Sequence, residues 1–223
     1  MTNIVYTKTY PQPPFDKKEI LRYAGVRGDV PELAELVQEC LQEIENKLVY
    51  KVCFRDFPIK DEQMYLDLDF LKTDSADLRK NLRGCSCIVL FAATVGIELD
   101  RLIAKYSRIS PTKALLFQAI GAERIESLCD IFNGEITKQA EEAGLFTRPR
   151  FSPGYGDLPI EAQKEIFSVL DCPRKIGLSL NDSLLMSPSK SVTALIGIGS
   201  TVCEDFSGCK ICGREDCNYR RTE

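Results

Sequence analysis

The residues of this chain best suited to bind a charged small molecule lie in the segment RFSPGYGDLP, which begins at Arg150. Arg150 carries a planar guanidinium whose donors match a carboxylate or a phosphate. Pro153 restricts Ser152 to an extended conformation, and Gly154 tolerates the positive φ that the next position of a type II turn requires. Such a turn lets a ligand approach backbone N–H and C=O groups. We therefore expect an anion-binding arginine beside an accessible main-chain turn.

The rest of this segment supports two interpretations. Tyr155 adds an aromatic ring that can pack on a ligand, and Asp157 with Pro159 is typical of the start of a helix. Without a ligand, the same residues form an ordinary surface loop whose Arg150 pairs with a surface aspartate, since loops carry function often but not always.

A second charged candidate, Glu126, lies in a long stretch with helical spacing of apolar residues, from about residue 111 to 143. The apolar row alternates steps of four and three and consists of Leu115, Ala119, Ala122, Cys129, Ile136, Ala140 and Ala143. Glu126 and Asn133 interrupt this row. A carboxylate on a buried face needs a partner, because desolvation penalises its charge. We expect Glu126 to meet Arg150 or Arg101 in a structural ion pair, or to face the ammonium or sulfonium of a ligand.

Four thiols stand close together near the C-terminus, at Cys203, Cys209, Cys212 and Cys217. Four thiolates at this density suit a tetrahedral zinc ion or an iron–sulfur cluster, and the spacing does not choose between them. The alternative is a tail of free thiols. The other cysteines lie on apolar stretches, which is typical of small core residues, at Cys40, Cys53, Cys85, Cys87, Cys129 and Cys172.

Composition excludes several classes of function. The chain contains no histidine, which removes Ser–His and Cys–His nucleophile pairs, histidine metal ligands and the usual near-neutral general base. Its formal net charge of −4 gives no reason to expect nucleic-acid or acidic-membrane binding. No apolar run approaches the ~20 residues of a membrane span, and residues 1–14 are unlike a secretory signal. We therefore expect a cytoplasmic protein with reduced thiols.

The elements that must position these candidates follow the order helices, then strands, then mixed elements, which predicts an α+β fold with an antiparallel or mixed sheet. Helical patterns cover residues 17–24, 31–47, 95–106 and 111–143, and another helix begins at 73–75. Residues 48–54 and 64–70 alternate like strands, and the continuous apolar run 85–93 is typical of a central strand.

At 223 residues, the chain is long enough for one domain with a real core and a small appendage. We expect residues 1–14 to form an irregular arm, 15–200 to form the main domain, and 201–223 to form a Cys-rich metal-binding tail.

The pattern Arg-x-x-x-Gly-Tyr at residues 150–155 resembles the S-adenosylmethionine-binding segment of the reactivation domain of cobalamin-dependent methionine synthase. Similar segments lie on both sides, namely CIVLFAATVG from Cys87, the long helix after it, IGLSL from Ile176 and MSPSKSV from Met186. The resemblance covers roughly residues 75–199 and is closest to the short, free-standing members of the family. It implies a C-shaped α+β domain with a twisted antiparallel sheet and long helices.

The resemblance implies that the protein binds S-adenosylmethionine and supports reductive methylation of cob(II)alamin, a methyltransferase step in methionine biosynthesis. Because the chain has no histidine to ligate cobalt, the cobalamin is expected on a separate methionine synthase subunit or another corrinoid protein. An electron donor is expected to supply the electron for the reduction. In this scheme Arg150 clamps the methionyl carboxylate, the backbone from Ser152 through Pro153 to Gly154 meets the polar edge of the ligand, and Tyr155 packs nearby. Glu126 faces the ammonium, and Lys190 is a further candidate.

Two departures from the large multidomain enzyme accompany this resemblance. The family's Asp-Trp-Thr-Pro-type segment is missing from the N-terminal part, so its ligand-binding aspartate has no assigned counterpart. The Cys-rich tail stands where the enzyme continues with tyrosines that cover the ligand. The competing hypotheses are a redox or metal-cluster module built on the cysteines, and an activator of a different corrinoid protein.

Overall fold

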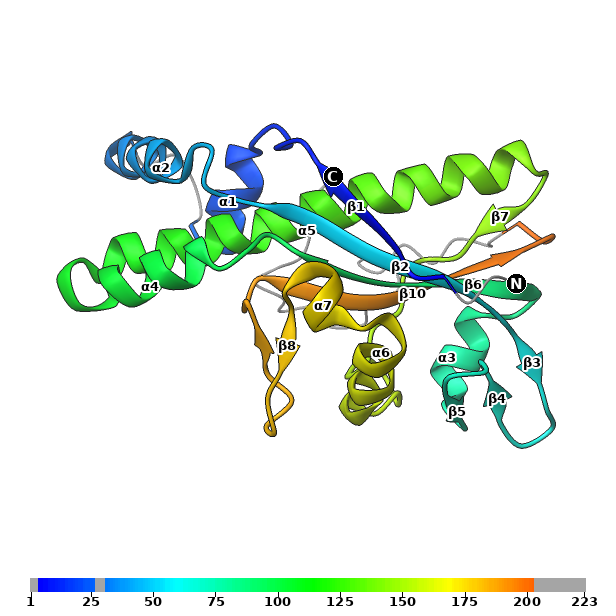
Figure 1. The fold of residues 1–223 in the computed structure, drawn as a ribbon. Helices are drawn as coiled ribbons and strands as arrows, with labels where there is room; N and C mark the ends of the chain where they lie inside the picture. The colour runs from blue at the N-terminus through cyan, green and yellow to red at the C-terminus, as the bar shows by residue number, and fades with distance from the viewer. Residues whose placement is uncertain (1–3, 27–30, 203–223) are drawn as a thin grey trace.

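A five-stranded antiparallel sheet forms the centre of the fold. The computed structural model describes residues 4–26 and 31–202 (Figure 1). The strands lie in the order β1 (Tyr6–Tyr10), β2 (Tyr50–Pro58), β6 (Cys85–Thr94), β10 (Ser191–Gly199) and β7 (Phe146–Thr147). Every pairing in it is antiparallel. The predicted α+β class and the central position of the 85–93 strand are confirmed.

Helices cover both faces of this sheet (Figure 1). The long helix α5 (Pro111–Glu142) packs on one face together with three others, α1 (Lys17–Tyr23), α2 (Pro31–Ile44) and α4 (Glu98–Ile109). The other face carries the short 3-10 helix η1 (Ile160–Ala162) and the two helices α6 (Gln163–Leu170) and α7 (Cys172–Ile176). Small elements complete the described part, namely β3 (Lys60–Asp61), β4 (Leu66–Asp67), β5 (Lys72–Thr73), α3 (Ala76–Asn81), β8 (Ser179–Leu180) and β9 (Met186–Ser187).

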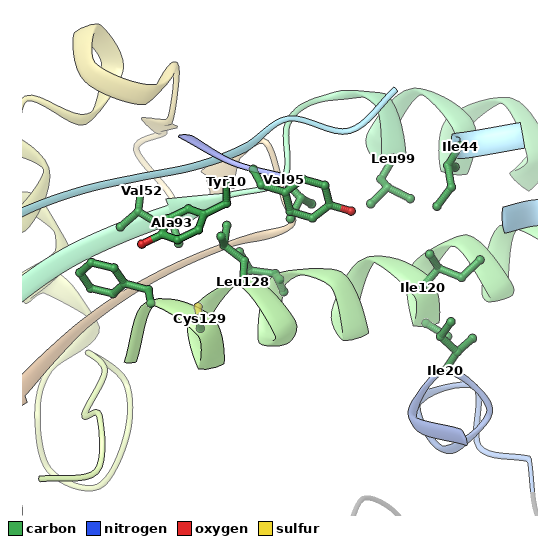
Figure 2. Close-up of a cluster of buried hydrophobic side chains, with 14 of the residues drawn as sticks. Tyr10, Ile20, Ile44, Val52, Ala93, Val95, Leu99, Ile120, Leu128 and Cys129 are labelled. Atoms are coloured by element: carbon green, nitrogen blue, oxygen red, sulfur yellow. The ribbon is translucent and has the colours of Figure 1, made fainter. Parts of the chain in front are cut away.

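Strand β6 is apolar from Cys87 to Ala93, and both of its faces are buried from Ile88 onward. Val89, Phe91 and Ala93 join the core beneath α5, whereas Ile88 and Leu90 join the core beneath α6 and α7. Successive side chains of a strand point to opposite faces, so alternation along β6 feeds two separate cores. Figure 2 shows the first of these cores, where side chains of β1, β2 and β6 meet helix α5.

The N-terminal segment differs from its prediction. Residues 1–14 were expected to be irregular, but Tyr6–Tyr10 forms β1 and pairs with β2 in the register Tyr6↔Phe54 to Tyr10↔Tyr50. An edge strand satisfies its backbone through one neighbour, and its own sequence carries little apolar signal because most of its side chains are exposed. The stretch Tyr6–Tyr10 is therefore part of the central sheet.

Helix α5 also differs in the face that it buries. Of the predicted apolar row, Ala119, Cys129, Ile136 and Ala140 are buried, whereas Leu115 is 53% exposed. A different pair, Glu123 and Arg124, is buried almost completely. Within residues 4–26 and 31–202, none of the helices combines the length and apolar character that a membrane crossing requires.

Candidate functional site

Two residues singled out from distant parts of the sequence, Arg150 and Glu126, meet in the folded chain. The guanidinium Nη2 of Arg150 donates to the Oε2 atom of Glu126 in a charge-assisted hydrogen bond. The same nitrogen lies 3.4 Å from Oδ1 of Asp130, one turn further along α5. The Arg150 and Glu126 side chains keep 24% and 31% of their surface exposed, so the ion pair is open to solvent on one side.

The backbone that follows Arg150 is held against strand β10. Phe151 forms a bridge to Leu195 of β10, with both N–H···O distances at 2.9 Å. Glu126 and Asp130 lie four residues apart on α5 and therefore share one helix face. Arg150, the residue immediately before this bridge, meets the two carboxylates of this helix face.

The groups around Arg150 stabilise its positively charged form. Burial opposes the guanidinium charge, but Cys129, Glu126 and Asp130 together outweigh it and raise the pKa of Arg150 above its ordinary value. Burial also raises the pKa of the Cys129 thiol to about 12, so this thiol is neutral near pH 7. The two carboxylates therefore provide the stabilising charge at neutral pH.

One donor of the Arg150 fork is unused. Its Nη1 atom is buried and has no hydrogen-bond partner among the described residues. Leaving a buried donor unsatisfied costs roughly 1–3 kcal/mol. A modest reorientation of the side chain toward an incoming carboxylate would remove this cost, so the arrangement is suited to accept an anion.

The turn after Arg150 adopts the predicted conformation. Gly154 has φ +85°, and its N–H donates to the Leu158 carbonyl at 2.9 Å. The Tyr155 N–H donates to the Ser152 carbonyl at 3.1 Å, so both of these N–H groups are used inside the turn. Pro153 is buried, whereas the Tyr155 ring is 66% exposed and lies edge-on to Phe151. Of the predicted ligand contacts here, the tyrosine ring is the more accessible and the two amides are not free.

Asp157 has a different role from the one predicted. It does not cap the helix that follows it; its carboxylate accepts hydrogen bonds from the Ser75 hydroxyl and from the N–H groups of Ala76 and Asp77. These groups belong to the start of α3, about 80 residues away in the sequence. The bonds, that of Ser75 first, lower the pKa of Asp157. Asp157 thus ties the Gly-Tyr turn to helix α3.

An acidic pocket of about 330 Å³ lies beside the ion pair, between α1 and α5. Its lining consists of Asp16, Glu19, Tyr23, Glu123, Glu126, Ser127 and Asp130. Of these residues, only Glu126 was predicted from the sequence as a site residue. The spacing of Glu123, Glu126 and Asp130 on one face of a predicted helix was a signal that could have identified the other two.

A buried ion pair holds the wall of this pocket in place. Glu123 and Arg124 are 2% and 0% exposed and bond to each other. Arg124 also donates to the carbonyls of Pro13 and Pro14 at 2.6 and 2.7 Å. Glu123 accepts from the backbone N–H of Asp16 at 3.3 Å. The segment that begins α1 is therefore fastened directly to α5.

The structure does not bring two other candidates to the pocket. Arg101 pairs with Glu98 on its own helix and not with Glu126. The stem of Lys190 packs against Gly121, where an added Cβ would lie 2.8 Å from its methylene carbons. Burial lowers the pKa of Lys190, and Asp100 partly opposes this effect.

The predicted metal ligands Cys203, Cys209, Cys212 and Cys217 lie outside the described residues. Among residues 4–26 and 31–202, no group of three or more His, Cys, Asp or Glu side chains is arranged to hold a metal ion. The remaining cysteines behave mostly as predicted, since four are buried and two are partly buried, namely Cys40, Cys53, Cys129 and Cys172, then Cys85 and Cys87.

Comparisons with known proteins identify the family and the fold of the chain. Residues 42–221 match the family described as "Vitamin B12 dependent methionine synthase, activation domain". This match extends at both ends beyond residues 75–199, the range over which the sequence resemblance was recognised. A crystal structure of the MetH reactivation domain bound to AdoHcy is similar in fold, with a TM-score of 0.62 and 14% sequence identity, over 86% of this chain and 78% of that chain. No curated protein matches the sequence.

Proposed function

This chain belongs to the family of vitamin B12 dependent methionine synthase activation domains, and on that premise we propose that it binds S-adenosylmethionine at Arg150 and the adjacent acidic pocket. There it supports reductive methylation of cob(II)alamin that is carried by a separate protein. The observation that carries this proposal is the Arg150 fork, which has one unpaired buried nitrogen and faces the carboxylates of α5.

The charges of the site complement those of the ligand. The methionyl end of S-adenosylmethionine has one carboxylate and two positive groups, the ammonium and the sulfonium. Arg150 provides a bidentate partner for the carboxylate. Glu126 and the other acidic side chains of the pocket provide partners for the positive groups. In this scheme the ligand carboxylate takes over part of the Arg150 fork, and Glu126 becomes free to face the ammonium.

The remaining predicted contacts have unequal support. The exposed ring of Tyr155 can pack on the ligand, because its outer face is not covered by the described residues. Ser152, Pro153 and Gly154 form the turn beneath it, and their contribution is to hold the shape of the site.

The chemistry needs no proton transfer. One electron from an external donor reduces the partner's cob(II)alamin, and the reduced cobalt attacks the sulfonium methyl. The carbon–sulfur bond breaks with its electron pair on sulfur, which leaves S-adenosylhomocysteine. The chain's contribution is to hold the methyl group in line, and proximity of this kind can supply much of a barrier. The absence of histidine is therefore compatible with the reaction.

Calorimetric titration of the purified chain with S-adenosylmethionine tests this proposal. We expect Arg150→Ala to weaken binding by about 2 kcal/mol, or roughly thirtyfold, because a charge-assisted contact is lost. Arg101→Ala is the matched control, since Arg101 forms an exposed pair away from the pocket. Equal affinities of the wild type and Arg150→Ala would remove Arg150 from the site.

The identity of the corrinoid partner requires a second assay. The chain is mixed with a cobalamin-loaded methionine synthase that lacks its own activation domain, and methylcobalamin is followed by absorption under a reductant. Formation only with S-adenosylmethionine and the intact chain supports a trans-acting role. Binding without methyl transfer would direct attention to another corrinoid protein.

We also propose that residues 201–223 form a separate metal-binding appendage, with Cys203, Cys209, Cys212 and Cys217 as ligands of zinc or an iron–sulfur cluster. The support is the density of thiols in the sequence. The absorption spectrum of the purified chain distinguishes the two metals, because an iron–sulfur cluster absorbs visible light and zinc does not. A preparation with neither bound metal nor sensitivity to the four Cys→Ser changes would refute this assignment.

A further inference from the structure

A second pocket, of about 370 Å³, lies among α3, the β3–β4 hairpin and the start of β6. None of its lining residues belongs to the acidic pocket. Figure 1 places α3 and the small β3–β5 sheet at the opposite end of the molecule from α1 and α2. This pocket is therefore a distinct feature of the surface.

The lining combines an apolar part with a cluster of positive charge. Ile59, Leu66 and Leu82 provide the apolar part, and Leu66 and Leu82 are buried. Three cations, Arg79, Lys80 and Arg83, share the pocket with a single carboxylate, Asp61. Pockets that bind small molecules typically pair an apolar lining with a few converging polar groups.

Helix stability explains only part of this charge. Arg79 and Lys80 lie in the last turn of α3, where cations are favourable because they oppose the helix dipole. Arg83 lies beyond the helix end and has an exposed side chain, so the dipole does not account for it. Its main-chain carbonyl accepts from Nη2 of Arg148 at 2.9 Å, which fixes this wall of the pocket.

Arg79 has an unsatisfied donor in this pocket. Its Nη2 donates to the Glu62 carbonyl at 3.2 Å. Its Nε lies 3.2 Å from Oδ1 of Asp61, yet it is buried and makes no hydrogen bond within the described part of the chain. Asp61 therefore only partly satisfies Arg79, and an added anion would gain from the remaining donor.

We propose that this pocket binds a small organic phosphate, with the phosphate at Arg79, Lys80 and Arg83 and an apolar or aromatic portion against Ile59, Leu66 and Leu82. Arginine and lysine together suit phosphate, and the volume is larger than an inorganic anion needs. This site is independent of S-adenosylmethionine binding.

The test uses UMP, uridine and inorganic phosphate as probes of the full chain in calorimetric titrations. Because Arg150 can also accept an anion, each titration is repeated with saturating S-adenosylmethionine, which fills the first site. UMP should bind at least about tenfold more tightly than uridine, and its affinity should fall as salt is raised, because the phosphate contacts are electrostatic. Saturating S-adenosylmethionine should leave UMP binding unchanged.

Arg83→Ala should weaken UMP binding by about tenfold or more, since it removes one charge-assisted contact. Arg83 lies in an exposed turn, so this change leaves the folded core intact. Arg108→Ala, on the exposed face of α4, is the matched control and should bind UMP as the wild type does. Equal binding of UMP and uridine, or no response to Arg83→Ala, overturns the proposal.

Discussion

Replacing the buried Arg124 with methionine tests how the wall of the acidic pocket is held. The side chain is 0% exposed, bonds to Glu123, and donates to the Pro13 and Pro14 carbonyls. Methionine fills most of the volume but leaves the Glu123 carboxylate without its cation. Breaking one half of a buried ion pair costs about 3–5 kcal/mol. For a chain of this size, about 1 kcal/mol corresponds to roughly 2–4 °C, so Tm should fall by about 6–20 °C.

Urea unfolding followed by circular dichroism measures this free energy directly. Arg101→Met is the matched control, because Arg101 forms an exposed pair with Glu98 that is worth about 0–1 kcal/mol. The double variant Glu123→Gln/Arg124→Met should recover part of the loss, since the uncompensated charge is then gone.

The same variant links stability to binding. Loosening the Pro13–Asp16 segment should weaken S-adenosylmethionine binding at temperatures where the chain is still folded, because that segment provides one wall of the pocket. A loss of stability no larger than that of Arg101→Met would refute the reasoning. The buried Glu123 carboxylate would then not depend on Arg124 for its stabilisation.

Two further predictions concern a turn glycine and a capping aspartate. Gly154→Ala should destabilise the chain by about 1–2 kcal/mol in thermal unfolding, because φ is +85° and the new Cβ would lie 3.0 Å from Ile160; Gly134→Ala, where nothing lies within 4 Å, should instead stabilise α5 by about 0.5–1 kcal/mol. Opposite signs are the key result, and equal effects would contradict the conformational argument. Asp157 has a lowered pKa in the folded chain, so its contribution should be complete above the ordinary aspartate pKa of about 3.9 and disappear as pH falls through the folded value. The difference in urea stability between the wild type and Asp157→Asn should therefore shrink with acidification, and a difference independent of pH would exclude Asp157 as its source.

Short-range sequence patterns were sufficient to predict several helices, strands and turns. The start of α3 follows from Ser75, whose hydroxyl accepts from the Leu78 N–H as an N-cap. The long apolar-periodic stretch predicts α5, and the continuous apolar run predicts β6. The turn at Gly154 follows from its neighbouring proline. In each case the residues that specify the element lie within it or next to it.

Other features depend on partners that are distant in sequence. Strand β1 exists because β2 offers it an edge, and its exposed side chains give no periodic signal of their own. Asp157 matches the start of the nearest helix but caps α3, because the folded chain brings that helix closer. The acidic wall formed by Asp16 and Glu19 depends on the packing of α1 against α5.

The sequence by itself determined the family resemblance, the α+β class and the choice of Arg150 and Glu126, because residue type and short-range spacing encode these properties. It left open whether Glu126 would meet Arg150 or Arg101. Tertiary structure decided that question, and it alone created the pocket beside the pair, because burial and long-range charge are properties of packed elements.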